Sequence, residues 1–212
     1  MRLLPVAVCI ALGSVVGPRI VERIGTTAVV VAGLVVFAAG LAWAATVDAD
    51  TSYLEIALQM VLLGGGLGLT TAPATEAIMG SLSPDKAGVG SAVNDTTREF
   101  GGTLGVAIVG SVFASVYTGR LAAAPGLTGL PVEARETMQR SIAAAYKVIG
   151  QLPANHAADV RVVVNHAFLD GLRVGSLVCA AIAVVAAVIV ARLLPARERV
   201  TETVTVTTGA LR

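Results

Sequence analysis

The sequence predicts an all-α membrane protein, a polytopic bundle of about five transmembrane helices. The first observation is compositional. Mean hydropathy is +0.81, and charged residues make up 14% of the 212 residues, whereas a soluble domain carries about 25%. The second is that five apolar runs reach or approach the roughly 20 residues that a helix needs to cross a bilayer. The net charge of +1 and the lack of a Lys/Arg cluster argue against nucleic acid as a partner.

Four of these runs are expected within residues 1–117, at about 3–17, 26–47, 56–79 and 86–117. The first is short, and we interpret it as a helix cut off by the start of the chain. A signal peptide is the other interpretation, but the run lacks a small-residue cleavage site. The second run carries no charged residue, and the fourth has a polar lead-in.

The segment 118–173 separates the fourth run from the last one and is expected outside the bilayer. It contains two apolar stripes at helical spacing, one from Met138 to Ile149 and one from Val160 to Phe168. Such stripes predict an amphipathic helical hairpin that lies against the membrane surface or the bundle.

The last span is expected at 174–194, and the Thr-rich tail at 195–212 is expected to be disordered. Lys and Arg concentrate in cytoplasmic loops. The loop at 18–25 contains two arginines, whereas the loop at 48–55 contains acids and no Lys or Arg. The first loop and the C-terminus are therefore expected in the cytoplasm, and the second loop outside.

The third span contains the glycine-rich stretch GGGLGLTTAP at 64–73. Gly64 and Gly68 have the small-xxx-small spacing that lets helix backbones approach closely in lipid, and Gly66 lies between them. Pro73 removes the hydrogen bond to the carbonyl of Leu69. Two interpretations follow: a flexible helix that lines a cavity and bends here, or tight helix packing alone.

Glu76 follows Pro73 near the predicted cytoplasmic end of the third span. Ionisable groups inside a membrane are costly and usually face a cavity or a partner. Glu76 is therefore a candidate for handling a proton or a cation. The alternative is an interfacial carboxylate that water or an arginine satisfies.

The lead-in of the fourth span carries polar side chains at helical spacing. Ser91, Asn94, Asp95 and Arg98 share one helical face, and Asp95 can pair with Arg98 at i,i+3. With Glu99, these residues are candidates for a gate whose charges make and break pairs, or for a static interfacial pair. Three glycines then predict a close approach of another helix: Gly101, Gly102 and Gly105.

The stretch from Gly64 to Phe113, which includes the glycine-rich third span and this lead-in, resembles the late-span signature of the EmrB/QacA-type, fourteen-span drug:proton antiporters of the major facilitator superfamily. The family block G-x-x-S-a-x-N-x-x-R-x-x-G-G-x-x-G is matched here by Gly88, Ser91, Asn94, Arg98, Gly101, Gly102 and Gly105. The segment PRIVERIGTT at 18–27 is similar to a cytoplasmic loop motif that helps latch the gates of such transporters. Glu22, Arg23 and Gly25 match it, whereas Pro18 and two threonines depart from it.

The resemblance implies a partial major facilitator fold that holds the last five of fourteen spans. The implied function is secondary active export of drugs or other amphipathic small molecules by proton antiport, with the missing N-terminal half as a partner. The implied location is the bacterial plasma (inner) membrane, with lipid around the chain. No enzymatic activity, cofactor or metal is implied. Carboxylates that usually couple protons belong to the missing half.

Other functions have less support in the sequence. A remnant that does not transport, or an accessory subunit that binds another transporter, is the main alternative. His156, His166, Asp159 and Asp170 are the only candidates for catalysis or metal binding, and their spacing matches no metal site. No ring of acids or filter loop indicates a channel.

Overall fold

The computed structural model describes residues 4–193, apart from the side chain of Pro84, and the predicted disordered tail at 195–212 lies outside this range. Within it, every regular element is a helix. Five helices are long and apolar enough to cross a membrane: α1 Leu4–Ile24, α2 Thr26–Ala44, α3 Tyr53–Gly80, α4 Ala87–Ala122 and α7 Ala154–Leu193. The predicted all-α bundle with about five membrane helices is therefore confirmed.

Short elements connect the long helices. The 3-10 turn η1 Pro84–Lys86 precedes α4, and η2 Pro125–Leu127 follows it. Two short helices, α5 Val132–Arg140 and α6 Ile142–Ile149, come before α7. Ser141 separates them in extended conformation, and its hydroxyl accepts a hydrogen bond from the Ala144 N–H as the N-cap of α6.

Two helices extend much further than the sequence expectation, α1 at its end and α7 at its start. The first helix was expected to end at residue 17, but α1 continues through Pro18 to Ile24, because a proline inside a helix removes only one backbone hydrogen bond. The chain turns instead at Gly25, which has φ 87°. The second apolar stripe of the expected hairpin is the first part of α7, a single 40-residue helix.

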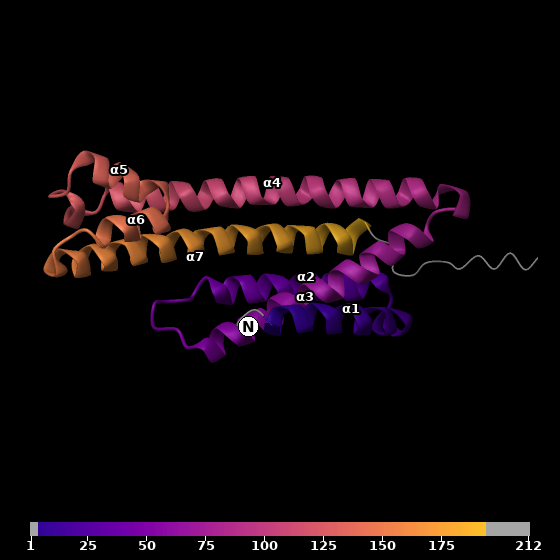
Figure 1. Cartoon of the computed structure of the whole chain (residues 1–212). Coiled ribbons are helices and arrows are strands. Elements are labelled where there is room, and N and C mark those ends of the chain that lie inside the picture. The colour runs from indigo at the N-terminus through magenta and orange to yellow at the C-terminus, as the bar shows by residue number, and fades with distance from the viewer. Residues whose placement is uncertain (1–3, 194–212) are drawn as a thin grey trace, which may run out of the picture.

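The long helices pack as a sequence of neighbours along one direction. Helix α3 packs between α1 and α2, α7 packs on α2, and α4 packs on α7. Figure 1 shows α4 and α7 as a long antiparallel pair above the group of α1, α2 and α3. Most of the surface of α4 has no neighbour within the described chain, because α7 covers only one side of it.

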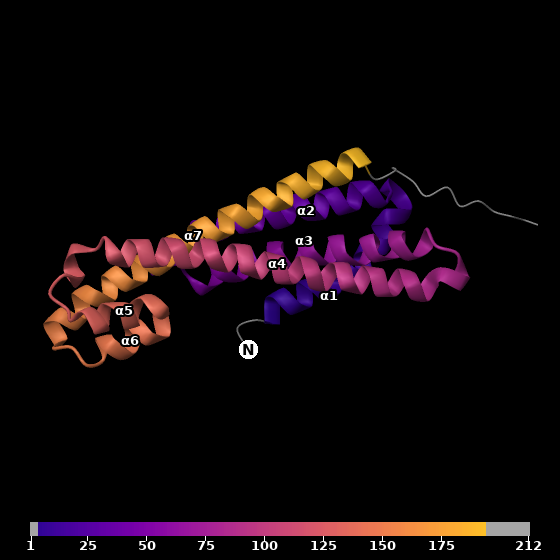
Figure 2. The ribbon, with the colours of Figure 1, turned by 90° about the horizontal axis from the view of Figure 1, so that it is seen from above.

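The far ends of α4 and α7 carry a small packed unit, which we name the cap: the residues from Phe113 to Phe168. At 1.5 Å per residue, α4 and α7 are about 54 and 60 Å long, whereas the hydrocarbon core is about 30 Å thick. Both helices therefore extend well beyond the bilayer. In Figures 1 and 2 the pair α5 and α6 lies at this end, past the loop that joins α2 to α3.

The cap has a hydrophobic core of its own, with Met138, Ala145 and Val164 fully buried. The Tyr117 hydroxyl donates a hydrogen bond of 3.1 Å to the carbonyl oxygen of Met138 and ties α4 to α5. Phe113 stands between Tyr117 and Phe168, stacked on one ring and edge-on to the other. The stripe that begins at Met138 thus packs against α4 and α7 instead of lying free on a membrane surface.

Candidate functional site

The glycine-rich stretch of α3 forms a seam against two other helices. A Cβ atom added to Gly64 would lie 2.6 Å from the carbonyl oxygen of Val6, and one added to Gly68 would lie 2.6 Å from that of Ile10. Both contacts are with α1. A Cβ atom on Gly66 would meet the backbone nitrogen of Phe37 on α2 at 2.6 Å. These three glycines therefore allow α3 to contact the backbones of α1 and α2 directly.

The partners of this seam are also glycines. Gly13 on α1 lies opposite Gly68, and Gly33 on α2 lies opposite Gly66. Helix α3 runs unbroken through Pro73, which is buried against Gly17. The structure therefore contains close packing and an unbroken helix at 64–73, and a hinge at this stretch stays a prediction.

Gly65 is different, because a Cβ atom there would have no neighbour within 4 Å. It lines an apolar groove of about 290 Å³ between α1 and α3, together with Cys9, Leu12, Gly13, Val16, Ile20, Val61 and Leu69. The third span thus presents one open glycine face beside the closed seam.

Glu76 is exposed on α3, and no hydrogen bond or ion pair of its side chain is found among residues 4–193. Its role in proton or cation handling stays a prediction.

The polar face of α4 is open. Asp95, Arg98 and Glu99 are exposed and Asn94 is half-buried. The expected pair between Asp95 and Arg98 is not formed: among the described residues, the ion pair that the structure contains joins Arg120 to Asp170 at 2.8 Å. Exposed side chains at i,i+3 gain little from pairing, because solvent competes for both charges.

The glycines that follow on α4 are equally open. A Cβ atom on any of Gly101, Gly102 or Gly105 would meet nothing within 4 Å in the described chain. Within the described chain, the close contact of α4 with another helix lies further along α4, at Val109 and Phe113. Gly171 and Gly175 of α7 contact Phe113 and Val109. Their four-residue spacing is a small-xxx-small signal that sequence reasoning missed.

The segment at 18–27, which is similar to the transporter loop motif, is mostly helical. Glu22 and Arg23 are exposed in the last turn of α1, and Gly25 is buried between α1 and α2. The Gly25 N–H donates to the carbonyl of Val21 at 2.8 Å. A φ of 87° is accessible to glycine without steric cost. This backbone conformation explains why a glycine stands at position 25 of the motif.

At the opposite end, a cluster that sequence reasoning did not single out links α2 to α3. The Trp43 Nε1–H donates to Glu55 Oε1 at 3.3 Å, and the Gln59 Nε2–H donates to the carbonyl of Trp43 at 3.5 Å. Gln59 is buried. A glutamine inside an apolar run was the available signal, because buried amides need hydrogen-bond partners.

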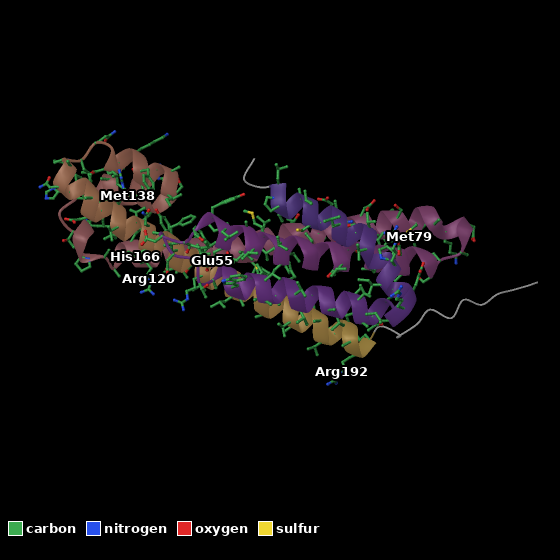
Figure 3. All side chains as sticks on the ribbon, turned by 90° about the horizontal axis from the view of Figure 1, so that it is seen from below. Glu55, Met79, Arg120, Met138, His166 and Arg192 are labelled. Atoms are coloured by element: carbon green, nitrogen blue, oxygen red, sulfur yellow. The ribbon has the colours of Figure 1, made fainter. Side chains whose placement is uncertain are left out.

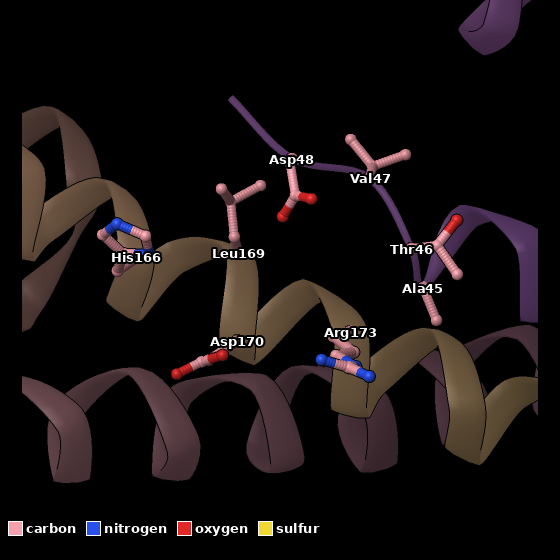
Figure 4. Close-up of a pocket in the computed structure, with 8 residues that line it drawn as sticks. All are labelled: Ala45, Thr46, Val47, Asp48, His166, Leu169, Asp170 and Arg173. Carbon is pink, nitrogen blue, oxygen red and sulfur yellow. The ribbon is translucent and has the colours of Figure 1, made fainter. Parts of the chain in front are cut away.

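Charged side chains near this cluster surround a shallow cavity of about 220 Å³. The cavity is lined by Asp48 in the loop after α2 and by His166, Asp170 and Arg173 on α7. In Figure 4, Asp48 lies beside Leu169 on one side of α7, and Asp170 lies on the opposite side of that helix. In Figure 3, His166, Arg120 and Met138 lie toward the cap, and Met79 lies near the other end. Residues 4–193 contain no group of three side chains suited to hold a metal ion, and His156 and His166 are both exposed.

Together the fold and these sites define a multi-pass helical membrane protein. The chain is 30% identical over 193 residues to the tetracenomycin C resistance and export protein of Streptomyces glaucescens, covering 89% of the chain and 36% of that protein. It is 31% identical over 134 residues to the multidrug transporter protein MdtP of Bacillus subtilis, covering 61% and 24%. It is 27% identical over 187 residues to the multidrug efflux pump LfrA of Mycolicibacterium smegmatis, covering 88% and 36%.

The chain is therefore homologous to bacterial drug and multidrug exporters, and the predicted resemblance to drug exporters of the major facilitator type is confirmed. It spans between 24% and 36% of the length of these three relatives. No protein-family model matches it.

Proposed function

We propose that this chain is the C-terminal part of a secondary active transporter that exports drugs or other amphipathic small molecules. It acts together with N-terminal spans like those that make up the rest of its relatives. The observation that carries the proposal is the 30% identity to a resistance and export protein across 89% of the chain. The transporter lies in the bacterial inner membrane with its C-terminus in the cytoplasm.

The open face of α4 supports this function. In a bilayer, a face with charged and amide side chains is stable only against protein or a water-filled cavity. The described chain offers Asp95 and Arg98 neither an ion pair nor a covering helix. The adjoining glycines leave room for a close neighbour. The N-terminal spans or the transport path supply what this face lacks.

Export is by rocking of one half of the transporter against the other around a central site. The glycine seam holds α1, α2 and α3 together as one body during this movement. Asp95 and Arg98 lie at one end of α4, where they exchange partners across the moving interface. Protons drive the cycle. The carboxylates that bind these protons lie in the N-terminal spans, and Glu76 is a candidate for a further one in this chain.

The test uses the chain with the spans that precede it, in everted membrane vesicles. An imposed proton gradient should drive accumulation of a cationic dye such as ethidium. Asp95→Asn with Arg98→Gln should lower the rate without lowering the amount in the membrane. Asp85→Asn, an exposed acid before α4, serves as the matched control. Full transport by the double variant would refute the gate.

An immunoblot of native membranes with an antibody against residues 197–212 separates this proposal from its alternative. A band far above 21.4 kDa supports a longer transporter. A band at that mass, with a second protein co-purifying, would replace the proposal by an accessory subunit or a remnant.

A further inference from the structure

Two adjoining cavities lie beside the loop that follows α2, at the end of the bundle that carries the cap. The first, of about 220 Å³, is lined by Asp48 from this loop and by Arg173 from α7 (Figure 4). The second, of about 390 Å³, is lined by Asp50 and shares three residues with the first: Asp48, His166 and Leu169. The proposed export mechanism uses neither cavity.

The first cavity lies at the depth of the lipid headgroups. Helix α2 has 19 residues, which is about 29 Å at 1.5 Å per residue, so it just crosses a hydrocarbon core of about 30 Å. The cavity-lining residues 45–48 follow directly after its last residue. On α7, Arg173 directly precedes the run 174–191, which contains no charged residue. Both walls of the cavity therefore begin where the apolar spans end.

The charges of the two cavities follow an order along α7. Arg173 lines the first cavity, next to the apolar run. The second cavity is lined by the α7 residues between Val162 and Leu169, which lie farther from that run, and by Asp50. Asp48 lines both cavities. A cation thus lies at the membrane end of this site and two carboxylates lie toward its outer end.

The two charges of the first cavity have no partner of their own. The side chains of Arg173 and Asp48 make no hydrogen bond or ion pair among residues 4–193; the Asp48 contact to Thr51 is made by its main-chain N–H. Asp170 also lines the cavity, but its charge is balanced by Arg120 at 2.8 Å. Hydrogen bonds between ionised groups are the strong ones, so a ligand that carries both an anion and a cation suits this pair.

An exposed apolar stripe continues from Arg173 into the membrane. Side chains four, eight, eleven and fifteen positions after Arg173 share its helix face, and all of them are exposed and apolar: Leu177, Ala181, Val184 and Val188. A hydrocarbon chain attached to an anion at Arg173 would lie along this stripe. The stripe offers nothing to a small soluble zwitterion, which has no hydrocarbon chain to place there.

We propose that this site binds the headgroup of a zwitterionic phospholipid with a primary ammonium group, phosphatidylethanolamine. The phosphate oxygens accept hydrogen bonds from the Arg173 guanidinium, and the ammonium donates to the Asp48 carboxylate. The acyl chains lie along the stripe that begins at Leu177. The phosphate of such a lipid lies deeper than its ammonium, which is the order of the charges along α7. This site rests on the membrane fold and does not depend on the proposed export function.

The same order of charges disfavours an anionic lipid. Phosphatidylglycerol offers a phosphate to Arg173, but its uncharged glycerol would face Asp48 and Asp50 without a cation. The lipid would then bring a negative charge close to two carboxylates and balance neither of them. The proposed site therefore discriminates between two phospholipids that differ in the headgroup alone.

The experiment measures energy transfer from Trp43 to a phosphatidylethanolamine that carries pyrene on one acyl chain, with the full chain in dodecyl maltoside micelles. Trp43 is the single tryptophan and precedes the lining residue Ala45 by two positions. Unlabelled phosphatidylethanolamine should abolish the transfer saturably. Phosphatidylglycerol should need about tenfold more lipid for the same effect. Phosphoethanolamine, the headgroup without acyl chains, should leave the transfer unchanged at the same concentrations.

Two variants test the two charges separately. Arg173→Gln should weaken the binding of phosphatidylethanolamine about tenfold. Asp48→Asn should weaken it too, but should leave phosphatidylglycerol binding no weaker, so the preference between the two lipids shrinks. The matched controls on α7 are Arg192→Gln at its other end and Asp159→Asn, an exposed acid that lines neither cavity. Both controls should leave the transfer unchanged.

Several results would overturn the proposal. They are equal displacement by the two lipids, unchanged binding in Arg173→Gln, and an unchanged lipid preference in Asp48→Asn. Displacement by phosphoethanolamine would also overturn it, since it would assign the cavities to a soluble zwitterion. Circular dichroism and the emission of Trp43 without the pyrene lipid identify any variant whose fold has changed. For such a variant the lipid preference of the unaltered chain still decides, because it needs no substitution.

Discussion

The glycine seam of α3 makes a sharp prediction about two positions that look alike in the sequence. Gly65 and Gly68 lie one turn apart in the same helix. A Cβ atom at Gly65 meets nothing within 4 Å, whereas one at Gly68 lies 2.6 Å from the carbonyl oxygen of Ile10 and 3.0 Å from the Cα of Gly13. Gly65→Ala and Gly68→Ala therefore add the same methyl group to an open and a closed site.

The magnitudes follow from two opposing effects. Alanine is favoured over glycine inside a helix by roughly 0.5–1 kcal/mol, so Gly65→Ala should be neutral or stabilise by about this amount. At Gly68 both neighbours are backbone atoms, which cannot rotate away, so α1 must move from α3. Overpacking of this kind costs about 1–3 kcal/mol. The gain in helix propensity is the same for both variants, so they should differ by the overpacking cost, roughly 1–3 kcal/mol in the free energy of unfolding.

The assay is reversible unfolding of the full chain in mixed micelles, followed by circular dichroism. Gly68→Ala should lower the midpoint, and Gly65→Ala should leave it unchanged or raise it. Equal destabilisation by both would refute the reasoning, because the contact between α1 and α3 would then not be decided by these backbone distances. Rescue of Gly68→Ala by a second substitution is not expected, since the atoms in contact belong to the main chain.

Three further predictions concern single contacts. Gly25→Ala should destabilise the chain by about 1–2 kcal/mol in the same unfolding assay, because φ 87° is strained for alanine. Gly88→Ala is the control, since a Cβ atom at Gly88 meets nothing within 4 Å. Tyr117→Phe removes the hydrogen bond to the Met138 carbonyl and should lower the stability of the cap by about 1 kcal/mol. Limited proteolysis of the cap should then be faster, and an unchanged cleavage rate would contradict the prediction. The Glu55 carboxylate accepts a hydrogen bond from Trp43 Nε1–H, so Glu55→Ala should loosen the indole and increase acrylamide quenching of the single tryptophan. Asp50→Ala should leave the quenching unchanged.

Much of the candidate site was predictable from residue types, but its contacts were not. The small-xxx-small spacing at 64–68 predicts close packing, and in the structure Gly64 and Gly68 lie against backbone atoms of α1. The same argument for Gly101, Gly102 and Gly105 predicts a neighbour that the described chain does not contain. The spacing of small residues shows that a helix face allows another helix to approach closely. It carries no information about which helix, if any, lies opposite.

The sequence by itself determined the fold class and the number of membrane helices. Burial in lipid depends on the summed hydropathy of about 20 consecutive residues, and every backbone hydrogen bond of a helix joins residues close in sequence. The helical class and the number of membrane helices can therefore be read along the chain. The resemblance to drug exporters was equally local, since it rests on short motifs, chiefly the block from Gly88 to Gly105 and, more weakly, the segment at 18–27.

Only the tertiary structure decided the features that depend on residues far apart in the chain. It placed the stripe from Met138 against α4 and α7 as the core of a cap. It closed Gly68 and left Gly65 open, and it left Arg135 Nε buried without a partner. The physical reason is common to all three: contact, burial and hydrogen-bond satisfaction depend on atoms of other helices, whose positions no local pattern contains.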